Sequence, residues 1–284
     1  MNIKPKHTVI SEFEVKDKIN ANDIIKISVF KKEIGKTAPH KHNNYYEIIY
    51  LSKGCGSHTI DSQKFLIKPP TLFIIRKEQV HHWNIENEAE GFVIIIKKSF
   101  IEGNLDKEIT QLFSKISAFT CMHPKDATTI EQLLELLNKE SQEMDDGQSM
   151  ILRNGLLKAL FAKILQSEPV PITKLKVFNN MRFQMFIDLL TDEKVIINKV
   201  DYYATLLNTT PQNLNAICRK EAEKSASQII SEFMIVEANR FLLYTDLTIS
   251  EISHSLEFKD ISNFTKYFKK HTSYTPTNFR KLNK

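Results

Sequence analysis

The N-terminal part of the chain alternates short apolar runs with residues that favour turns. The runs are rich in β-branched and aromatic residues: Ile24 to Phe30, Tyr45 to Leu51, Phe65 to Lys68, Leu72 to Ile75 and Phe92 to Ile96. Gly, Pro, Asn and Asp interrupt them, as in compact all-β domains. The pattern predicts a small β-barrel or β-sandwich between Ile24 and about Lys97.

A helical rhythm begins near Leu105 and continues to Gln166. Apolar residues recur there at helical spacing, first at Ile130, Leu133, Leu134 and Leu137, then at Leu152, Leu156, Leu157, Leu160 and Ile164. Asp145, Asp146 and Gly147 mark the turn between these two helices. The wide apolar stripes exceed what one partner helix covers, so we expect a dimer interface, with packing against the β domain as the alternative.

Two prolines, Pro169 and Pro171, end the helical pattern, because each removes an amide donor and favours an extended predecessor. From about Asn179 the sequence again reads as helical. The chain is therefore predicted to be an α+β multidomain protein. Its parts are a β domain at 1–103, a helical connector at 104–166, a linker at 167–178 and an all-α domain at 179–284.

The all-α domain contains an internal repeat. Val200, Tyr203, Ala204 and Leu207 match Ile249, Ile252, Ser253 and Leu256 at an offset of 49 residues, and Leu214 and Cys218 match Phe264 and Phe268 at 50. Each copy has a small residue inside a first helix, a turn, and a second helix with apolar residues four apart, as a helix-turn-helix requires. The sequence thus predicts two helix-turn-helix units in tandem.

Helix start signals support these units. Asn198 with Asp201, and Thr248 with Glu251, are spaced as N-cap and N3 residues of the two first helices. Thr210 precedes Pro211, which suits the first position of a helix. An N-cap at Asp260 would open the last recognition helix.

Three stretches carry a family pattern: Tyr203 to Asn215, Glu237 to Leu243, and Ile249 to Arg280, which ends in Thr275-Pro276 and Phe279-Arg280. Over these stretches the chain resembles the AraC/XylS family of bacterial transcriptional regulators. The resemblance implies that two recognition helices, joined by a helix at Gln228 to Tyr244, enter successive major grooves of double-stranded DNA. The chain departs from the family where glycine is usual, at Glu223, Glu257 and Ser273.

The resemblance also implies which side chains meet DNA. The base-reading positions are Gln212, Asn215 and Ala216 in the first unit and Ile261, Ser262, Asn263 and Lys266 in the second. Arg219, Lys220, Lys269 and Lys270 are expected to contact phosphates. The alternative is that these residues form ordinary solvated helix faces.

In the β domain, Gly35, His40-Lys41-His42, Glu47 and Gly54 resemble the first motif of cupins. His81-His82-Trp83 stands where the second motif places its histidine, although Lys77-Glu78 departs from that motif. A cupin-like barrel in such a regulator implies a small-molecule effector, a sugar or an aromatic acid, bound by His40, His42, Tyr46, Glu47, Arg76, His81 and Trp83. The alternatives are an empty barrel, or a metal held by His40, His42, Glu47 and His81.

Charge and cysteine content fit this interpretation. The net charge is only +5, but from Phe264 onward every charged residue is basic, which favours a polyanionic partner. Cys55, Cys121 and Cys218 match neither a disulfide framework nor a zinc motif, and no signal peptide or membrane span is recognisable. These features favour a cytoplasmic protein. The family resemblance implies a homodimer that contacts RNA polymerase, needs no cofactor and is not an enzyme. The alternative is a metal-dependent cupin enzyme with a DNA-binding tail.

Overall fold

The computed structural model describes residues 14–20, 23–31, 34–104, 106–142, 147–167, 180–192 and 196–283. Two compact units result, one spanning Val15–Val177 and the other containing Phe178–Lys284. The turn predicted at Asp145 and Asp146, and the linker predicted at 167–178 beyond Ser167, lie outside the described residues. Within the described part, no helix is long and apolar enough to cross a membrane.

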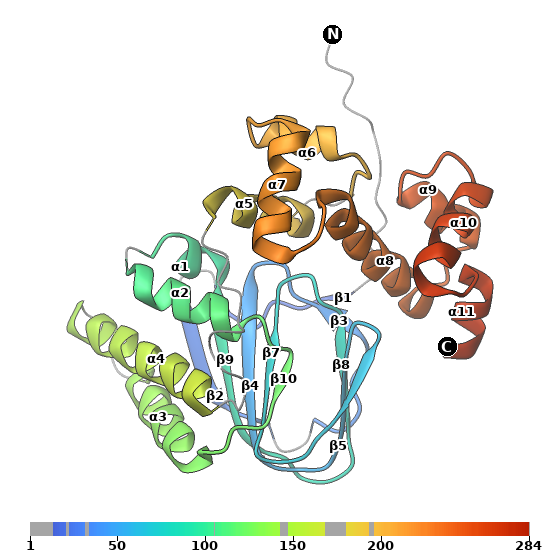
Figure 1. The fold of residues 1–284 in the computed structure, drawn as a ribbon. Coiled ribbons are helices and arrows are strands. Elements are labelled where there is room, and N and C mark those ends of the chain that lie inside the picture. The colour runs from blue at the N-terminus through green and yellow to red at the C-terminus, as the bar shows by residue number, and fades with distance from the viewer. Residues whose placement is uncertain are drawn as a thin grey trace. The chain divides into compact units, whose positions relative to one another are not determined.

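The strands of the first unit form two separate five-stranded sheets (Figure 1). One sheet has the order β1 (Glu14–Val15), β3 (His40–Lys41), β8 (His81–Ile85), β5 (Gly56–Ile60), β6 (Gln63–Leu66). The other has the order β10 (Cys121–Met122), β7 (Thr71–Ile75), β4 (Tyr45–Lys53), β9 (Glu90–Lys97), β2 (Ile25–Val29). The strands β1 and β10, at one edge of each sheet, are only two residues long. Among the described strands, no ladder joins one sheet to the other. The predicted barrel is therefore corrected to an open sandwich.

The central strands β4 and β7 are buried on both faces, which explains their unbroken apolar sequences. Side chains of a strand alternate between faces, so Ile48 and Ile74 join one core while Ile49 and Phe73 join another. The first core lies under the helices α1 (Lys98–Glu102), α2 (Lys107–Ile116), α3 (Ala127–Glu140) and α4 (Gly147–Ser167). The second core lies between the sheets. The predicted connector helices thus exist, and they cover a sheet.

The second unit is entirely helical in its described residues. It comprises α5 (Met181–Asp192), α6 (Val200–Leu206), α7 (Pro211–Ala222), α8 (Ala226–Tyr244), α9 (Ile249–Ser255), α10 (Ile261–Thr272) and α11 (Pro276–Asn283). Five of the six pairs matched by the repeat are buried in both copies: Tyr203, Ala204, Leu207, Leu214 and Cys218, and then Ile252, Ser253, Leu256, Phe264 and Phe268. The sixth pair, Val200 and Ile249 at the helix starts, is partly exposed. The repeat read from the sequence is therefore a repeat of core positions.

The helix starts agree with the predictions at three places and differ at one. Thr210 and Asp260 each accept a hydrogen bond from the backbone N–H at N3, and Thr248 with Glu251 forms a reciprocal capping box. The predicted cap at Asn198 is wrong. α6 begins one residue later, with Lys199 as an N-cap whose side chain makes no capping bond.

Candidate functional site

The first recognition helix, α7, has one buried and one exposed face. Leu214 and Cys218, four residues apart, anchor it in the core. The opposite face carries exposed side chains at Gln212, Asn213, Ala216, Arg219 and Lys220. These exposed groups include amide donors and acceptors near the helix start and two cations in its last turn.

The second recognition helix, α10, repeats this arrangement. Phe264 and Phe268 are fully buried. The exposed positions are Ile261, Ser262, Asn263, Lys266, Lys269 and Lys270. The Ile261 side chain, 46% exposed at the first helical position, offers an apolar surface of the kind that contacts a thymine methyl group.

Asn215 is placed differently from the other predicted base-reading residues. It is only partly exposed, and both ends of its amide are bonded within the domain. Its Nδ2 donates to Pro211 O at 3.0 Å, and its Oδ1 accepts from the Ala226 N–H at 3.0 Å. The second bond satisfies one of the free N–H groups at the start of α8. This geometry gives Asn215 a structural role inside the domain. The exposed Asn213, two residues earlier at the position that matches Asn263, has its side chain on the surface.

A histidine cluster lies between the two sheets of the first unit. His40 on β3 pairs directly with His81 on β8, His42 follows β3, and Glu47 lies on β4 in the facing sheet. All four side chains are at most 2% exposed. We call His40, His42, His81 and Glu47 the histidine cluster.

Short contacts join the rings of the cluster. His42 Nε2 lies 2.9 Å from His81 Nε2 and 3.4 Å from Glu47 Oε1. His81 Nε2 lies 3.9 Å from Glu47 Oε2. The nearest ligand atoms of His40, His42 and His81 all lie within 4.8 Å of one another. The Nε2 atoms of His42 and His81 therefore meet beside one carboxylate.

Each histidine has a partner at Nδ1 outside the cluster. His40 Nδ1 lies 3.0 Å from Ala38 O, which only accepts, so its Nε2 presents a lone pair. His42 Nδ1 lies 2.9 Å from Lys16 O and 2.7 Å from Tyr45 Oη. His81 Nδ1 lies 2.9 Å from His58 Nε2. These outer contacts fix the ring orientations, as the outer partners of metal-binding histidines do.

Burial makes these imidazoles neutral at physiological pH. Desolvation lowers the pKa of His40 to about 4 and holds the pKa of His81 well below its usual range. The pKa of His42 is lowered by the same cause, against the opposing effect of Glu47. Neutral imidazole is the form that binds a metal.

The cluster fits a divalent metal ion. Three imidazoles and one carboxylate are a ligand set that zinc and similar ions accept. His40 Nε2 and Glu47 Oε2 are buried and find no hydrogen-bond partner among the described residues, a costly state that an ion would relieve. Tetrahedral coordination places neighbouring ligand atoms about 3.3 Å apart, close to the distances between His42, His81 and Glu47.

The effector set predicted from the sequence is only partly brought together. Tyr46 and Glu47 are adjacent on β4, so Tyr46 faces the helices and packs edge-on against Phe113. Arg76 donates from Nη1 to Ser117 O, at the outer side of the sandwich. Trp83 is 3% exposed and stacks on His58 with ring centroids 3.5 Å apart. The seven residues therefore do not line one pocket.

Three neighbours of the cluster were not predicted. His58 bonds to His81, and Tyr45 bonds to His42. Lys18 donates from Nζ to Glu47 Oε1 at 2.8 Å, with the lysine 37% exposed and the glutamate 1% exposed. His58 lies on β5 opposite Trp83, so strand alternation would have placed it beside His81 once β5 was recognised.

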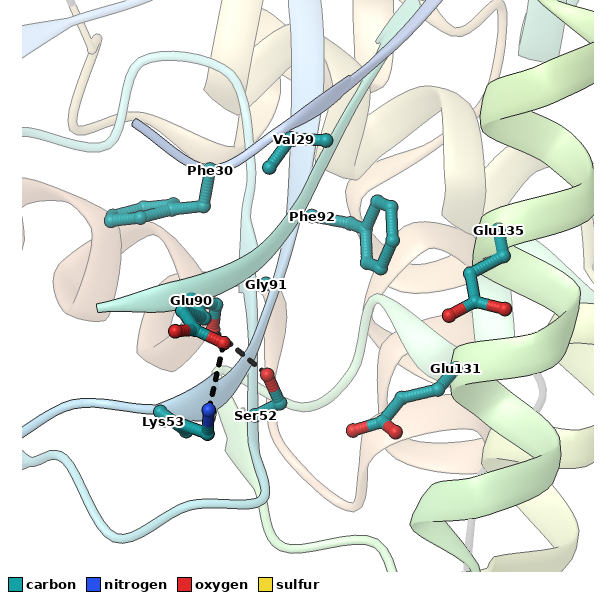
Figure 2. A pocket seen from close by; sticks show the side chains of 9 residues that line it. All are labelled: Val29, Phe30, Ser52, Lys53, Glu90, Gly91, Phe92, Glu131 and Glu135. Atoms are coloured by element: carbon teal, nitrogen blue, oxygen red, sulfur yellow. Dashed lines mark hydrogen bonds and ion pairs between the residues drawn. The ribbon is translucent and has the colours of Figure 1, made fainter. Parts of the chain in front are cut away.

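A separate cavity of about 520 Å³ opens between β9 and α3. Its lining comprises Val29, Phe30, Ser52, Lys53, Glu90, Gly91, Phe92, Glu131 and Glu135. Figure 2 shows Phe92 projecting from the sheet toward α3, whose Glu131 and Glu135 point back at it. Lys53 Nζ pairs with Glu90 at 3.0 Å, and Glu131 accepts from Tyr50 Oη at 2.8 Å. The volume lies within the range of small-molecule sites.

Two family models match the chain. Residues 35–157 match the AraC-like ligand binding domain, and residues 203–282 match a helix-turn-helix domain. The first match runs from the strands after β2 into the first half of α4, and the second runs from within α6 almost to the end of α11.

Several known proteins are similar to this chain over most of their length. The Msm operon regulatory protein of Streptococcus mutans is 23% identical over 242 residues, covering 83% of this chain and 84% of its own. The raffinose operon regulatory protein RafR of Pediococcus pentosaceus is 20% identical over 253 residues, covering 85% and 88%. Among solved structures, ToxT of Vibrio cholerae is 12% identical with a TM-score of 0.42, covering 92% of this chain and 99% of its own. This chain belongs to the AraC family of transcriptional regulators, as a ligand-controlled DNA-binding protein and not an enzyme.

Proposed function

We propose that the chain reads two segments of one DNA face through the exposed faces of α7 and α10. The observation that carries this proposal is the repetition of the exposed face at a constant offset of 50 residues, from Gln212 and Asn213 to Ser262 and Asn263. Gln and Asn side chains pair with adenine, and Lys266 suits guanine O6 and N7. Arg219, Lys220, Lys269 and Lys270 neutralise phosphates at the far end of each helix.

Footprinting of the full chain on selected genomic fragments tests this arrangement. We expect two protected segments about 10 base pairs apart on one face of the duplex. Gln212→Ala should change base preference in one segment, and Lys266→Ala in the other. A single protected segment would contradict the proposal that both helices bind DNA. So would a change of base preference that falls in the same segment for both variants.

We also propose that the organic effector occupies the cavity between β9 and α3. The histidine cluster leaves no space for one, because His42 and His81 contact each other directly. The cavity offers Phe92 for stacking, carboxylates as acceptors, and Ser52 and Lys53 as donors. Three glutamates face one lysine, so an aromatic acid is repelled, whereas a sugar gains hydrogen bonds. The regulation of a raffinose operon by RafR supports this ligand class.

A thermal-shift screen of sugars and aromatic acids tests the assignment, because a ligand that binds only the folded protein raises its melting temperature. We expect sugars alone to produce shifts, with Phe92→Ala and Glu135→Gln abolishing them. Glu140→Gln, on the same helix but outside the lining, is the matched control. A shift by aromatic acids that survives Phe92→Ala would exclude this site.

The oligomeric state and the response to the effector complete the proposed function. The chain acts as a cytoplasmic homodimer, with effector binding in the N-terminal unit changing engagement of DNA and RNA polymerase. Leu136 on α3 and Ile151 and Leu152 on α4 are 48%, 74% and 47% exposed, which supports a dimer contact on these helices. Sedimentation of Ile151→Glu against the unchanged chain tests the contact, and an unchanged dimer would refute it.

A further inference from the structure

We propose that Asn213 and Asn263 select DNA bases that carry an exocyclic amine, adenine or cytosine, because Thr209 and Asp260 hold their side-chain amides in one orientation. This inference rests on the proposed binding of DNA by α7 and α10, and it names the class of base that each helix selects. Its new element is a pair of positioning residues, Thr209 and Asp260, which act through the asparagines.

The two asparagines occupy matched positions, at the third residue of each recognition helix. Both side chains are exposed, and both backbones are fixed by the cap residue of the helix. The Asn213 N–H donates to Thr210 Oγ1 at 3.2 Å, and the Asn263 N–H donates to Asp260 Oδ1 at 2.7 Å. The first turn of each helix therefore presents its asparagine from a defined place.

The side-chain amides are held as well. Asn263 Nδ2 donates to Asp260 Oδ2 at 2.9 Å, and Asn213 Nδ2 donates to Thr209 Oγ1 at 2.7 Å. Thr209 is itself fixed, because its N–H donates to Ala204 O at 2.9 Å. An asparagine amide carries its donor and its acceptor on opposite sides of Cγ. With Nδ2 turned toward these residues, each Oδ1 is turned away from them and is available to a base.

An outward oxygen discriminates between bases in the major groove. Adenine N6 and cytosine N4 carry amines that donate to it, whereas guanine O6 and thymine O4 are acceptors that repel it. Asn263 and Asn213 therefore favour adenine or cytosine. The second hydrogen of Nδ2 remains available for adenine N7.

The orientation is stricter at Asn263 than at Asn213. A carboxylate only accepts hydrogen bonds, so turning the Asn263 amide over would place its Oδ1 against Asp260 Oδ2, two acceptors with no hydrogen between them. The Thr209 hydroxyl both accepts and donates, so it permits either orientation of Asn213. We therefore expect sharper discrimination beneath α10 than beneath α7.

Selection of binding sites from a randomised duplex library by the full chain tests the proposal. The base that meets each asparagine is the position whose preference is lost in Asn263→Ala or in Asn213→Ala. We expect adenine or cytosine at both positions, favoured about tenfold over guanine and thymine opposite Asn263 and less opposite Asn213. Guanine or thymine as the selected base opposite Asn263 would overturn the proposal.

The variant Asp260→Asn separates positioning from capping. Asparagine caps a helix as well as aspartate does, but its Nδ2 would donate to Asn263 Oδ1 and turn the Asn263 amide over. The base preference should then move to guanine or thymine, whose O6 and O4 accept. Asp201→Asn makes the same change of charge on α6 and should leave this preference as it is. An unchanged preference in Asp260→Asn would overturn the proposal.

The variant Thr209→Val gives the corresponding test in α7. It removes the acceptor of Asn213 Nδ2, so the base preference at that position should broaden to include guanine and thymine. Thr205→Val, on the exposed surface of α6, is the matched control and should change no preference. A preference opposite Asn213 that stays as narrow in Thr209→Val would overturn the role of Thr209.

Failure of this inference is distinguishable from failure of the proposed function. If Asn213→Ala and Asn263→Ala change no base preference while Gln212→Ala and Lys266→Ala still do, the asparagine proposal is wrong and the binding of DNA by both helices stands. If none of the four variants changes a base preference, both proposals are wrong.

Discussion

Asn208 and Glu257 occupy the same left-handed position in the two helix-turn-helix turns, with φ of 48° and 58°. The following N–H closes each turn on the small residue of the first helix, Thr209 onto Ala204 and Phe258 onto Ser253. Glu223 and Ser273 form a second matched pair after the recognition helices, with φ of 57° and 67°. The positions that lack the usual glycine are therefore the positions that need left-handed backbone.

Glycine at these positions should stabilise the second unit. Glu223→Gly, Glu257→Gly and Ser273→Gly should each raise the free energy of unfolding by about 1 kcal/mol, because only glycine enters this region without steric strain. Asn208→Gly is the control and should change it much less, since asparagine tolerates the conformation. Urea denaturation gives the free energy of unfolding of all four variants. If the three glycine variants are less stable than the unchanged chain, the glutamate and serine side chains stabilise the fold by more than the left-handed backbone costs.

Charge reversal on α10 should weaken binding to all DNA alike. Replacing Lys269 and Lys270 by Glu removes two phosphate contacts, so the slope of log affinity against log salt should flatten by about 2. Lys64→Glu with Lys139→Glu makes the same change in net charge on the first unit and serves as the control. Fluorescence anisotropy on specific and random duplexes gives both slopes, and equal slopes for the two double variants would exclude the phosphate contacts.

Asn215 and Gln212 should respond differently to alanine. Asn215→Ala removes two hydrogen bonds inside the domain and should lower the free energy of unfolding by about 1 kcal/mol while base preference stays the same. Gln212→Ala should leave stability unchanged and weaken binding by about 1–3 kcal/mol at one base pair. Binding to a randomised operator library, with thermal melts of each variant, separates the roles. A relaxed base preference in Asn215→Ala would restore it as a base reader.

Acid should weaken the start of α9. Hydrogen bonds from Thr248 lower the pKa of Glu251, so its ionised form stabilises the folded state above the unfolded pKa and this contribution is lost as pH falls through the folded pKa. Glu251→Gln should therefore differ most from the unchanged chain at about pH 7 and least near about pH 3. Asp201→Asn, in the matching helix whose cap side chain makes no bond, is the control. A stability difference that is constant with pH would refute the assignment.

Sequence reasoning was most successful where burial repeats at a fixed period. Phe264 and Phe268 could be paired with Leu214 and Cys218 because core positions of a helix recur every three or four residues. The strands β5 and β8 were missed because Ser57, His58, His81 and His82 are polar residues. Alternation nevertheless directs His58 and His81 into the space between the sheets and Ser57 and His82 to the opposite face. The prediction that Tyr46 and Glu47 line the same pocket could have been avoided, because adjacent residues of a strand point to opposite faces. The cavity beside α3 joins segments distant in sequence, which no local pattern reveals.

The Arg280 guanidinium donates to Leu242 O at 3.0 Å and to Leu247 O at 2.7 Å. It therefore clamps the end of α8 to the loop that leads into α9, using a side chain near the last residue of α11. For anyone engineering this regulator, the C-terminal helix is part of the joint between the two DNA-reading units. A fusion partner should therefore be attached after Asn283 through a linker. Truncation that removes Arg280 from α11 would break both hydrogen bonds between this helix and the connection from α8 to α9.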